Sequence, residues 1–124
     1  MQTTLTIFIL EDEVLIRMMV AEMLEELGHR VVAETGSVPE ARSLAASVEF
    51  DLALLDINIK GDTSADIAAI IEKRGLPLIF VSGYTTTGLP APFQDRRVLR
   101  KPFPVEALKR SIEHAMAGAS RGSI

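Results

Sequence analysis

The chain has 124 residues, of which 48% are hydrophobic and 24% charged, and this composition predicts one folded domain and excludes a disordered chain. Its formal net charge of −4 gives no electrostatic basis for binding nucleic acid or an anionic membrane, and the lack of cysteine excludes disulfides and thiolate metal sites. The first apolar run stops at Leu10, before three acidic residues, so we expect no signal peptide, no membrane span and a cytoplasmic protein.

The first half of the chain alternates apolar runs with helical repeats. Residues 5–10 predict a buried strand, and apolar residues then recur at helical spacing until Gly28, which we expect to end the first helix. A second short strand is predicted over residues 30–34. Ser37 has the position of a helix N-cap, and Glu40 completes a capping box, so a second helix should begin there.

The second half repeats this alternation. A third strand is predicted over residues 51–55, followed by a polar loop and a second start like a capping box at residues 63–66. Gly75 should end that helix, and Pro77 should open a fourth strand.

The last third contains one irregular interval. Residues 84–95 should carry a crossover helix, but two prolines and a glycine predict that this helix is short or mobile. A fifth strand is predicted over residues 97–100, and Pro104 should begin a final helix. We expect a domain over residues 1–118 and a flexible tail over residues 119–124.

Strands that alternate with helices at this spacing predict an α/β fold, a doubly wound parallel sheet with right-handed crossovers. Periodicity alone does not give the strand order.

Reactive side chains follow four of the predicted strands, each just past the strand's C-terminal end. They are Glu11 and Asp12, Asp56, Ser82 and Lys101. The C-terminal ends of parallel strands share one edge of the sheet, where open α/β sheets bind ligands. We therefore expect these side chains to form one site.

The chemistry of this set favours phosphoryl transfer. Two carboxylates about 4 Å apart repel by roughly 4 kcal/mol at an effective dielectric constant near 20, so three of them need a proton or a cation. Oxygen ligands with an open coordination sphere favour Mg²⁺, with Mn²⁺ as an alternative. The Lys101 ammonium and the Ser82 hydroxyl add a second charge and a donor, and carboxylates are known to form acyl-phosphates.

Each residue also has an ordinary structural interpretation. Taken alone, Asp12 caps the first helix, Asp56 starts a loop, Ser82 belongs to a turn and Lys101 is a solvated strand end. Four such residues at four strand ends are much harder to explain by chance, so we favour the functional interpretation.

Other polar and sulfur-containing residues receive no site role. His29 and His114 have no pattern of partners and should face solvent. The methionines of the first helix, Met18, Met19 and Met23, should pack within the protein. That helix nevertheless has Val14, Leu15 and Met18 beyond the stripe that its core needs, which predicts either deeper burial or a surface for a partner beside the acidic site.

These motifs resemble, over residues 5–117, the receiver domain of bacterial two-component response regulators. The resemblance rests on Glu11-Asp12, on Asp56 after an apolar strand, on Ser82 and on Lys101-Pro102-Phe103. It implies a flavodoxin-like five-stranded sheet in the order 2-1-3-4-5 and a cis peptide before Pro102. It further implies that a histidine kinase or phosphotransfer protein phosphorylates Asp56, with Mg²⁺ held by Glu11, Asp12, Asp56 and the Asn58 backbone carbonyl.

The segment over residues 77–84 further resembles the FATGUY class of single-domain receivers. We therefore expect no output domain, so that phosphorylation acts by changing the surface that binds an unknown downstream protein. Lys60 and Val98 depart from the family, in which many members have proline and a switch aromatic at these places. Ser82 stands where threonine is commoner, a mild change that keeps the hydroxyl. Together the three departures argue against the usual hydroxyl–aromatic switch, not against phosphorylation.

Three rival classes fit parts of the chain, and we expect a signalling protein rather than an enzyme. A small phosphatase with an aspartyl nucleophile is the alternative, although Asn58 stands where such enzymes want a second acid. A calcium loop beginning at Asp56 would put Lys60 at a ligand position. A flavin module would need a phosphate cradle where Glu11 and Asp12 repel phosphate.

Overall fold

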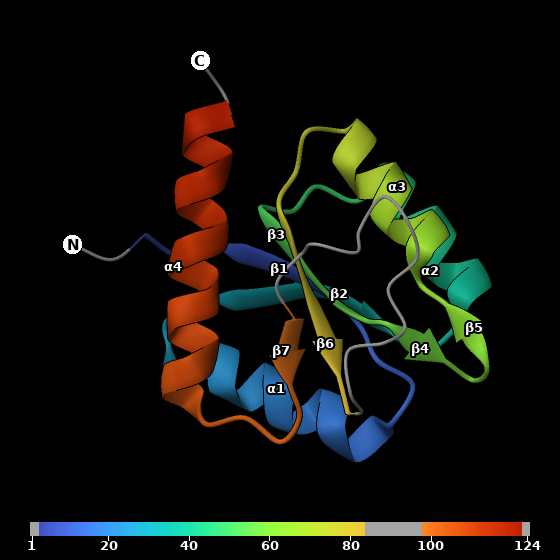
Figure 1. The fold of residues 1–124 in the computed structure, drawn as a ribbon, viewed down its shortest axis with the longest axis horizontal. Coiled ribbons are helices and arrows are strands. Elements are labelled where there is room, and N and C mark those ends of the chain that lie inside the picture. The colour runs from blue at the N-terminus through green and yellow to red at the C-terminus, as the bar shows by residue number, and fades with distance from the viewer. Residues whose placement is uncertain (1–2, 84–97, 123–124) are drawn as a thin grey trace.

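The structure is a computed structural model that describes residues 3–83 and 98–122. Five parallel strands form one sheet in the order β2-β1-β3-β6-β7 (Figure 1). The strands are β1 (Thr6–Leu10), β2 (Arg30–Thr35), β3 (Leu52–Asp56), β6 (Leu78–Ser82) and β7 (Val98–Arg100). Counted among the strands of this sheet alone, the order is the predicted 2-1-3-4-5.

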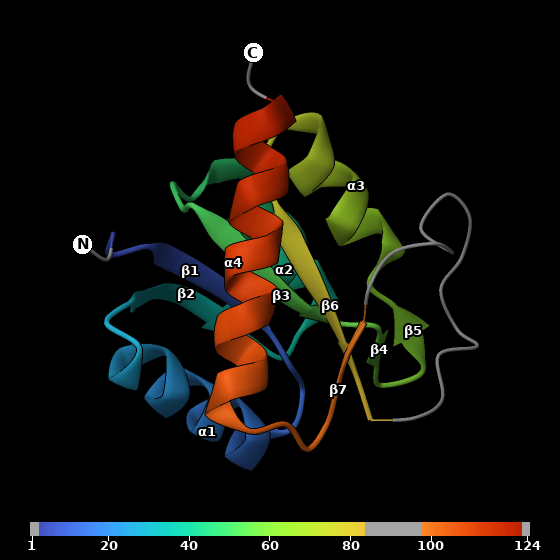
Figure 2. The same cartoon turned by 60° about the vertical axis from the view of Figure 1, so that its left-hand side comes forward.

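Helices cover both faces of the sheet, as expected for a doubly wound fold. They are α1 (Val14–Glu26), α2 (Val38–Ser47), α3 (Ala65–Lys73) and α4 (Val105–Gly122). The helices α1 and α4 pack on one face and α2 and α3 on the other, and Figure 2 shows α4 in front of the sheet and α2 behind it.

The core lies in two layers because side chains alternate along each strand. In β1, Phe8 and Leu10 join the layer under α2 and α3, whereas Ile7 and Ile9 join the layer under α1 and α4. The central strand β3 is buried along its whole length. A strand buried on both faces is a rigid support for the residue at its end.

The predicted helix ends are confirmed at two glycines and one cap. Gly28 and Gly75 follow α1 and α3 with φ angles of 91° and 77°, a region that favours glycine. The Ser37 hydroxyl accepts the N–H of Glu40 at 3.3 Å and caps α2. The capping box predicted over residues 63–66 is not formed, because the N-cap of α3 is Ser64 rather than Thr63, and the Thr63 hydroxyl accepts the N–H of Ala65 at 3.4 Å. Ser64 makes no side-chain cap, and its hydroxyl is buried without a partner in the described part of the chain.

The loop predicted after the third strand is a small hairpin. Its strands are β4 (Asn58–Ile59) and β5 (Asp62–Thr63), which pair antiparallel. The two residues between them, Lys60 and Gly61, have φ angles of 51° and 89°, as a type I′ turn requires. The turn places the backbone of Lys60 close to the end of β1.

The remaining fold predictions concern the end of the last helix, residues 84–95 and membrane-spanning helices. The helix α4 continues to Gly122, past the boundary predicted at residue 118, and the flexibility of residues 119–124 stays a prediction. The interval over residues 84–95 lies outside the described residues. Among the helices that the structure describes, none is long and apolar enough to cross a membrane.

Two predictions about single side chains are wrong. Met18 and Met19 do not pack within the protein but are 53% and 52% exposed. His29 is half-buried rather than solvent-facing, and its Nδ1 accepts the N–H of Leu5 at 3.1 Å. Burial lowers the pKa of His29 below its usual value of 6.5. This histidine therefore joins the end of α1 to the start of β1 in its neutral form.

Candidate metal and phosphoacceptor site

The predicted site residues lie together at the C-terminal edge of the sheet. The register of the parallel strands explains this arrangement, because Leu10 pairs with Leu55, Asp56 with Val81 and Ser82 with Arg100. The strand ends surround a cavity of about 490 Å³. Its lining residues are Asp12, Glu13, Ile16, Asp56, Asn58, Gly83, Lys101 and Pro102.

Three carboxylates form the acidic part of this site. Glu11 and Asp56 are only 3% and 6% exposed, and Asp12 is half-buried. One carboxylate oxygen from each lies within 4.8 Å of the other two. A set of close carboxylate oxygens on an open cavity fits a hard divalent cation that keeps some of its water. The residues therefore fit Mg²⁺ and Mn²⁺.

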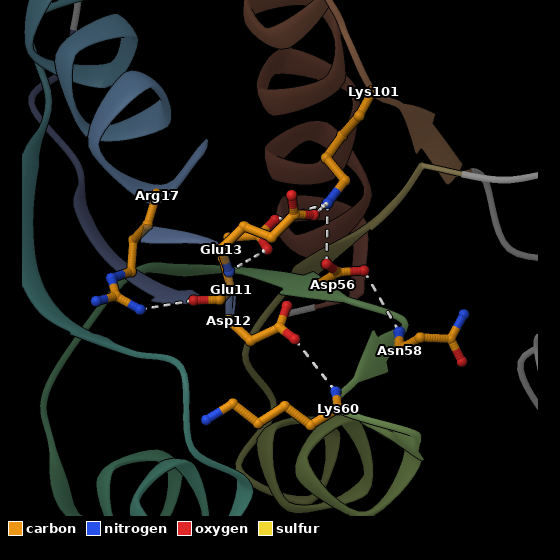
Figure 3. Close-up of polar contacts among 8 residues, drawn as sticks. All are labelled: Glu11, Asp12, Glu13, Arg17, Asp56, Asn58, Lys60 and Lys101. Atoms are coloured by element: carbon orange, nitrogen blue, oxygen red, sulfur yellow. Dashed lines mark hydrogen bonds and ion pairs between the residues drawn. The ribbon is translucent and has the colours of Figure 1, made fainter. Parts of the chain in front are cut away.

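Lys101 lies between two of these carboxylates. Its ammonium Nζ is 2.9 Å from Glu11 Oε1 and 3.0 Å from Asp56 Oδ2, and 3.5 Å from Glu13 Oε1 (Figure 3). Burial alone would lower the pKa of Lys101, but the hydrogen bonds to Glu11 and Asp56 outweigh burial and raise it above its usual range. The lysine is therefore a fixed positive charge beside these carboxylates.

Glu11 has a strongly perturbed acidity. Burial raises its pKa from 4.5 to about 7, against the lowering effect of its hydrogen bonds from Lys101 and from the N–H of Glu13, and the charge of Asp56 raises it further. The carboxyl group of Glu11 therefore exchanges its proton near neutral pH.

Backbone N–H groups of the β4–β5 hairpin hold the other two carboxylates. The N–H of Lys60 donates to Asp12 Oδ2 at 3.2 Å, and the N–H of Asn58 donates to Asp56 Oδ1 at 3.3 Å (Figure 3). Asn58 thus lies at the cavity, as the sequence indicates, but coordination by its backbone carbonyl stays a prediction.

Ser82 and Lys101 come from neighbouring strand ends. The Ser82 side chain is buried, and its backbone carbonyl accepts the N–H of Lys101 at 2.8 Å. The peptide bond between Lys101 and Pro102 is cis, as the resemblance implies. The two ends are therefore joined directly beside the carboxylates.

Sequence reasoning missed two charged residues around the site. Glu13 makes the third contact to Lys101, and its place in the acidic run after the first strand is a signal that points to it. Arg17 binds the backbone carbonyl of Glu11 through Nη1 at 2.7 Å. The sequence points to Arg17 only indirectly, through Glu34, an acid near the end of the neighbouring strand. Arg17 Nε donates to Glu34 Oε1 at 3.1 Å.

Comparisons with known proteins identify relatives of this chain. The sequence profile of the response regulator receiver domain matches residues 7–113. The transcriptional regulatory protein PdtaR of Mycobacterium tuberculosis is 34% identical over 115 residues, which are 90% of this chain and 56% of that protein. The sensory transduction protein LytR of Staphylococcus haemolyticus is 30% identical over 84% of this chain and 42% of its own length. The chain thus spans about half the length of these relatives.

Solved structures show the same architecture. SdrG from Sphingomonas melonis has a TM-score of 0.82 and 31% identity, covering 94% of this chain and 99% of SdrG. The response regulator PhyR from Brucella abortus has a TM-score of 0.80 and 30% identity, covering 97% of this chain and 51% of PhyR. Receiver domains bind Mg²⁺ at an acidic pocket and work with histidine kinases or phosphotransfer proteins. This chain belongs to the family of response regulator receiver domains.

Proposed function

We propose that Asp56 accepts a phosphoryl group from a phosphohistidine in a Mg²⁺-dependent reaction, and that the protein signals by changing its binding to another protein. The observation that carries the proposal is the position of Asp56. Its carboxylate is buried at the end of the central strand, beside two further carboxylates and 3.0 Å from the Lys101 ammonium.

The proposed step transfers one phosphoryl group between two side chains. A carboxylate oxygen of Asp56 forms the new bond to phosphorus, the bond from phosphorus to the donor's imidazole nitrogen breaks, and the imidazole keeps that electron pair. Mg²⁺ held by Glu11, Asp12, Asp56 and the Asn58 carbonyl would neutralise the charge on the phosphoryl oxygens. The Lys101 ammonium, which pairs with Asp56 in the structure, would bind a phosphoryl oxygen after transfer. Ser82, on the next strand, would donate its hydroxyl to another.

Intact-mass spectrometry after incubation with acetyl phosphate tests this assignment. We expect one phosphoryl group on the wild type with Mg²⁺, none in excess chelator and none on Asp56→Asn. Asp51→Asn is a matched control, because Asp51 precedes the same strand but is exposed and binds the N–H of Thr6 at 2.8 Å instead. Equal labelling of Asp56→Asn and wild type would refute the proposal.

A small aspartyl phosphatase is the alternative. Following acetate and inorganic phosphate together after mixing with acetyl phosphate separates the two functions. A receiver releases about one equivalent of acetate as Asp56 is labelled, and phosphate follows only as slowly as the acyl-phosphate hydrolyses, whereas a phosphatase releases both at the same rate over many turnovers. Phosphate release that keeps pace with acetate release from the first turnover, and that Asp56→Asn abolishes, would favour the enzyme.

An exposed apolar surface on α1 supports docking of the phosphodonor. Val14, Leu15, Met18 and Met19 are 57%, 75%, 53% and 52% exposed, and the neighbouring Ile16 lines the cavity. We propose that these four residues bind a histidine kinase or phosphotransfer protein so that its phosphohistidine faces Asp56.

Substitution of the surface separates docking from chemistry. Leu15→Ser should slow transfer from a phosphorylated donor protein while leaving labelling by acetyl phosphate and the melting temperature unchanged, because this side chain is 75% exposed. Leu24→Ser, in the buried stripe of the same helix, should instead unfold the protein. Equal transfer rates for Leu15→Ser and the wild type would refute the role of this surface in docking the phosphodonor protein.

The output is a further part of the proposal. The resemblance of residues 77–84 to the FATGUY class supports a receiver that acts alone on a downstream protein. A pull-down with phosphorylated wild type and with unphosphorylated Asp56→Asn tests this directly. A partner that binds both forms equally would contradict signalling through this chain's own surface.

A further inference from the structure

Arg17 connects the ends of two neighbouring strands at the edge of the site. It lies in α1, and its side chain is only 19% exposed. Its guanidinium donates through Nη1 to the Glu11 carbonyl at 2.7 Å and through Nε to Glu34 Oε1 at 3.1 Å (Figure 3 shows the first contact). One planar group therefore joins the end of β1 to the neighbouring end of β2.

The chain leaves space for this contact at Gly36. A Cβ atom there would lie 2.9 Å from Arg17 Nη1, 3.0 Å from Asp12 Cα and 3.1 Å from the Glu11 carbonyl oxygen. Two of these three neighbours are backbone atoms of the acid pair, so a side chain at this position would push on the pair itself. The backbone of Gly36 has no positive φ, so the effect of a methyl group would be steric only.

Glu11 is thus held through both of its backbone polar groups. Its N–H donates to the Thr35 carbonyl at 3.0 Å, and its carbonyl accepts from Arg17. The carbonyl of Glu11 belongs to the peptide group that leads into Asp12, so its direction fixes how the second carboxylate leaves the strand.

We propose that Arg17 is a positioning residue for metal binding, which acts by fixing the Glu11–Asp12 peptide so that both carboxylates face the cation. The inference rests on the proposed function of the acidic site. Residues that orient metal ligands without touching the metal typically change metal affinity about 10- to 100-fold when replaced. Arg17 touches neither cation nor phosphoryl group in this assignment.

Arg17→Lys separates position from charge. Lysine keeps the positive charge near the carboxylates but does not have the planar fork that reaches two acceptors at once. If Arg17 acts only through its charge, Arg17→Lys should bind Mg²⁺ like the wild type. If it positions the peptide, Arg17→Lys should weaken binding about tenfold, close to the effect of Arg17→Gln.

Gly36→Ala perturbs the same peptide group and leaves Arg17 in the sequence. Its methyl group should crowd Asp12 Cα and the Glu11 carbonyl as well as the guanidinium, so the variant tests whether the position of the Glu11–Asp12 peptide sets the Mg²⁺ affinity, and Arg17→Lys tests whether Arg17 holds that position. Arg42→Lys is the matched control, because Arg42 makes an exposed 3.5 Å ion pair with Asp66 on the far side of the sheet from α1. That variant should bind Mg²⁺ as the wild type does.

The experiment is calorimetric titration of the intact protein with Mg²⁺, together with melting curves in chelator. We expect Arg17→Lys and Gly36→Ala to lose about tenfold in Mg²⁺ affinity, and saturating Mg²⁺ to restore their labelling by acetyl phosphate. Unchanged Mg²⁺ affinity in Arg17→Lys, whatever its melting temperature, would overturn the inference, as would a wild type that binds no Mg²⁺. Failure of acetyl phosphate to label the wild type, with Mg²⁺ binding intact, would refute the phosphoacceptor role alone.

Discussion

Replacing Lys101 by methionine removes one buried charge from between two carboxylates and keeps the aliphatic stem. In the structure Nζ is 2.9 Å from Glu11 and 3.0 Å from Asp56, and the three side chains are 9%, 5% and 8% exposed. Breaking a buried ion pair by removing one partner typically costs about 3–5 kcal/mol, because the other charge stays buried. In chelator at pH 8 we therefore expect Lys101→Met to lose about 3 kcal/mol or more of unfolding free energy.

The loss should depend on pH through Glu11. Its pKa is about 7 in the folded protein against 4.5 as the usual value, so the folded state binds the extra proton between these values. Stability from this group is therefore fully present below pH 4.5 and is lost as pH rises through 7. Without the ammonium this pKa should rise further, and the difference between Lys101→Met and the wild type should shrink on going from pH 8 to pH 6.

Magnesium should reduce the effect. The ammonium contacts two of the three carboxylates assigned to the metal, so it repels an incoming cation, and its removal should tighten Mg²⁺ binding about tenfold. At a Mg²⁺ concentration about 100 times the variant's Kd and about 10 times that of the wild type, binding adds roughly 2.7 kcal/mol to the variant and about 1.4 kcal/mol to the wild type, so the difference in stability should shrink by about 1.3 kcal/mol. Urea unfolding with chelator and with Mg²⁺ measures both quantities. Equal stability of variant and wild type in chelator, or weaker Mg²⁺ binding by the variant, would refute this account of Lys101.

Three further predictions concern single contacts and are measured by urea unfolding. Burial lowers the pKa of His29 below 6.5, so the unfolded chain binds more protons than the folded one, and the free energy of unfolding falls as pH drops below 6.5. His29→Asn keeps an acceptor for the N–H of Leu5 and should remove the contribution of His29 to this pH dependence. Lys60→Pro should cost more than about 1 kcal/mol, because proline cannot adopt a φ of 51° or donate to the nearby carboxylate, whereas Lys60→Gly should not. Ser64→Ala should be neutral or stabilising and Ser37→Ala should lose about 1 kcal/mol, and a reversed order would contradict the difference between the two caps.

The fold was predictable because its signals are local and repeated. Each strand is a short apolar run, each helix has its own spacing, and Gly28 and Gly75 mark two helix ends by a conformation that other residues avoid. The convergence of the reactive residues followed from one topological rule about parallel strands, without knowledge of any contact. The strand order and the cis peptide before Pro102 came from the resemblance, since no local pattern carries them.

The start of α3 shows where local signals fail. Thr63 occurs in the same kind of pattern as Ser37, but the N-cap is the next residue, Ser64. The N–H of Ser64 donates to the Ile57 carbonyl at 2.9 Å, and its φ and ψ of −90° and 16° are not those of an extended cap. The hairpin before the helix decides this conformation through contacts that tertiary structure supplies. The same hairpin, anchored by Lys60, reaches the end of β1 across 48 residues of sequence, which no local pattern records.

The charges of the site explain why its parts belong together. Three carboxylates and one ammonium carry a formal charge of −2 when Glu11 is ionised, which one divalent cation neutralises. Because the pKa of Glu11 is about 7, a proton and the cation compete for the same carboxylate near neutral pH. Phosphorylation adds negative charge at Asp56, and the ammonium that now bonds this side chain is the positive group already beside it. The buried lysine is therefore needed in both states, first to hold the carboxylates together without a cation and then to balance the charge that the phosphoryl group brings.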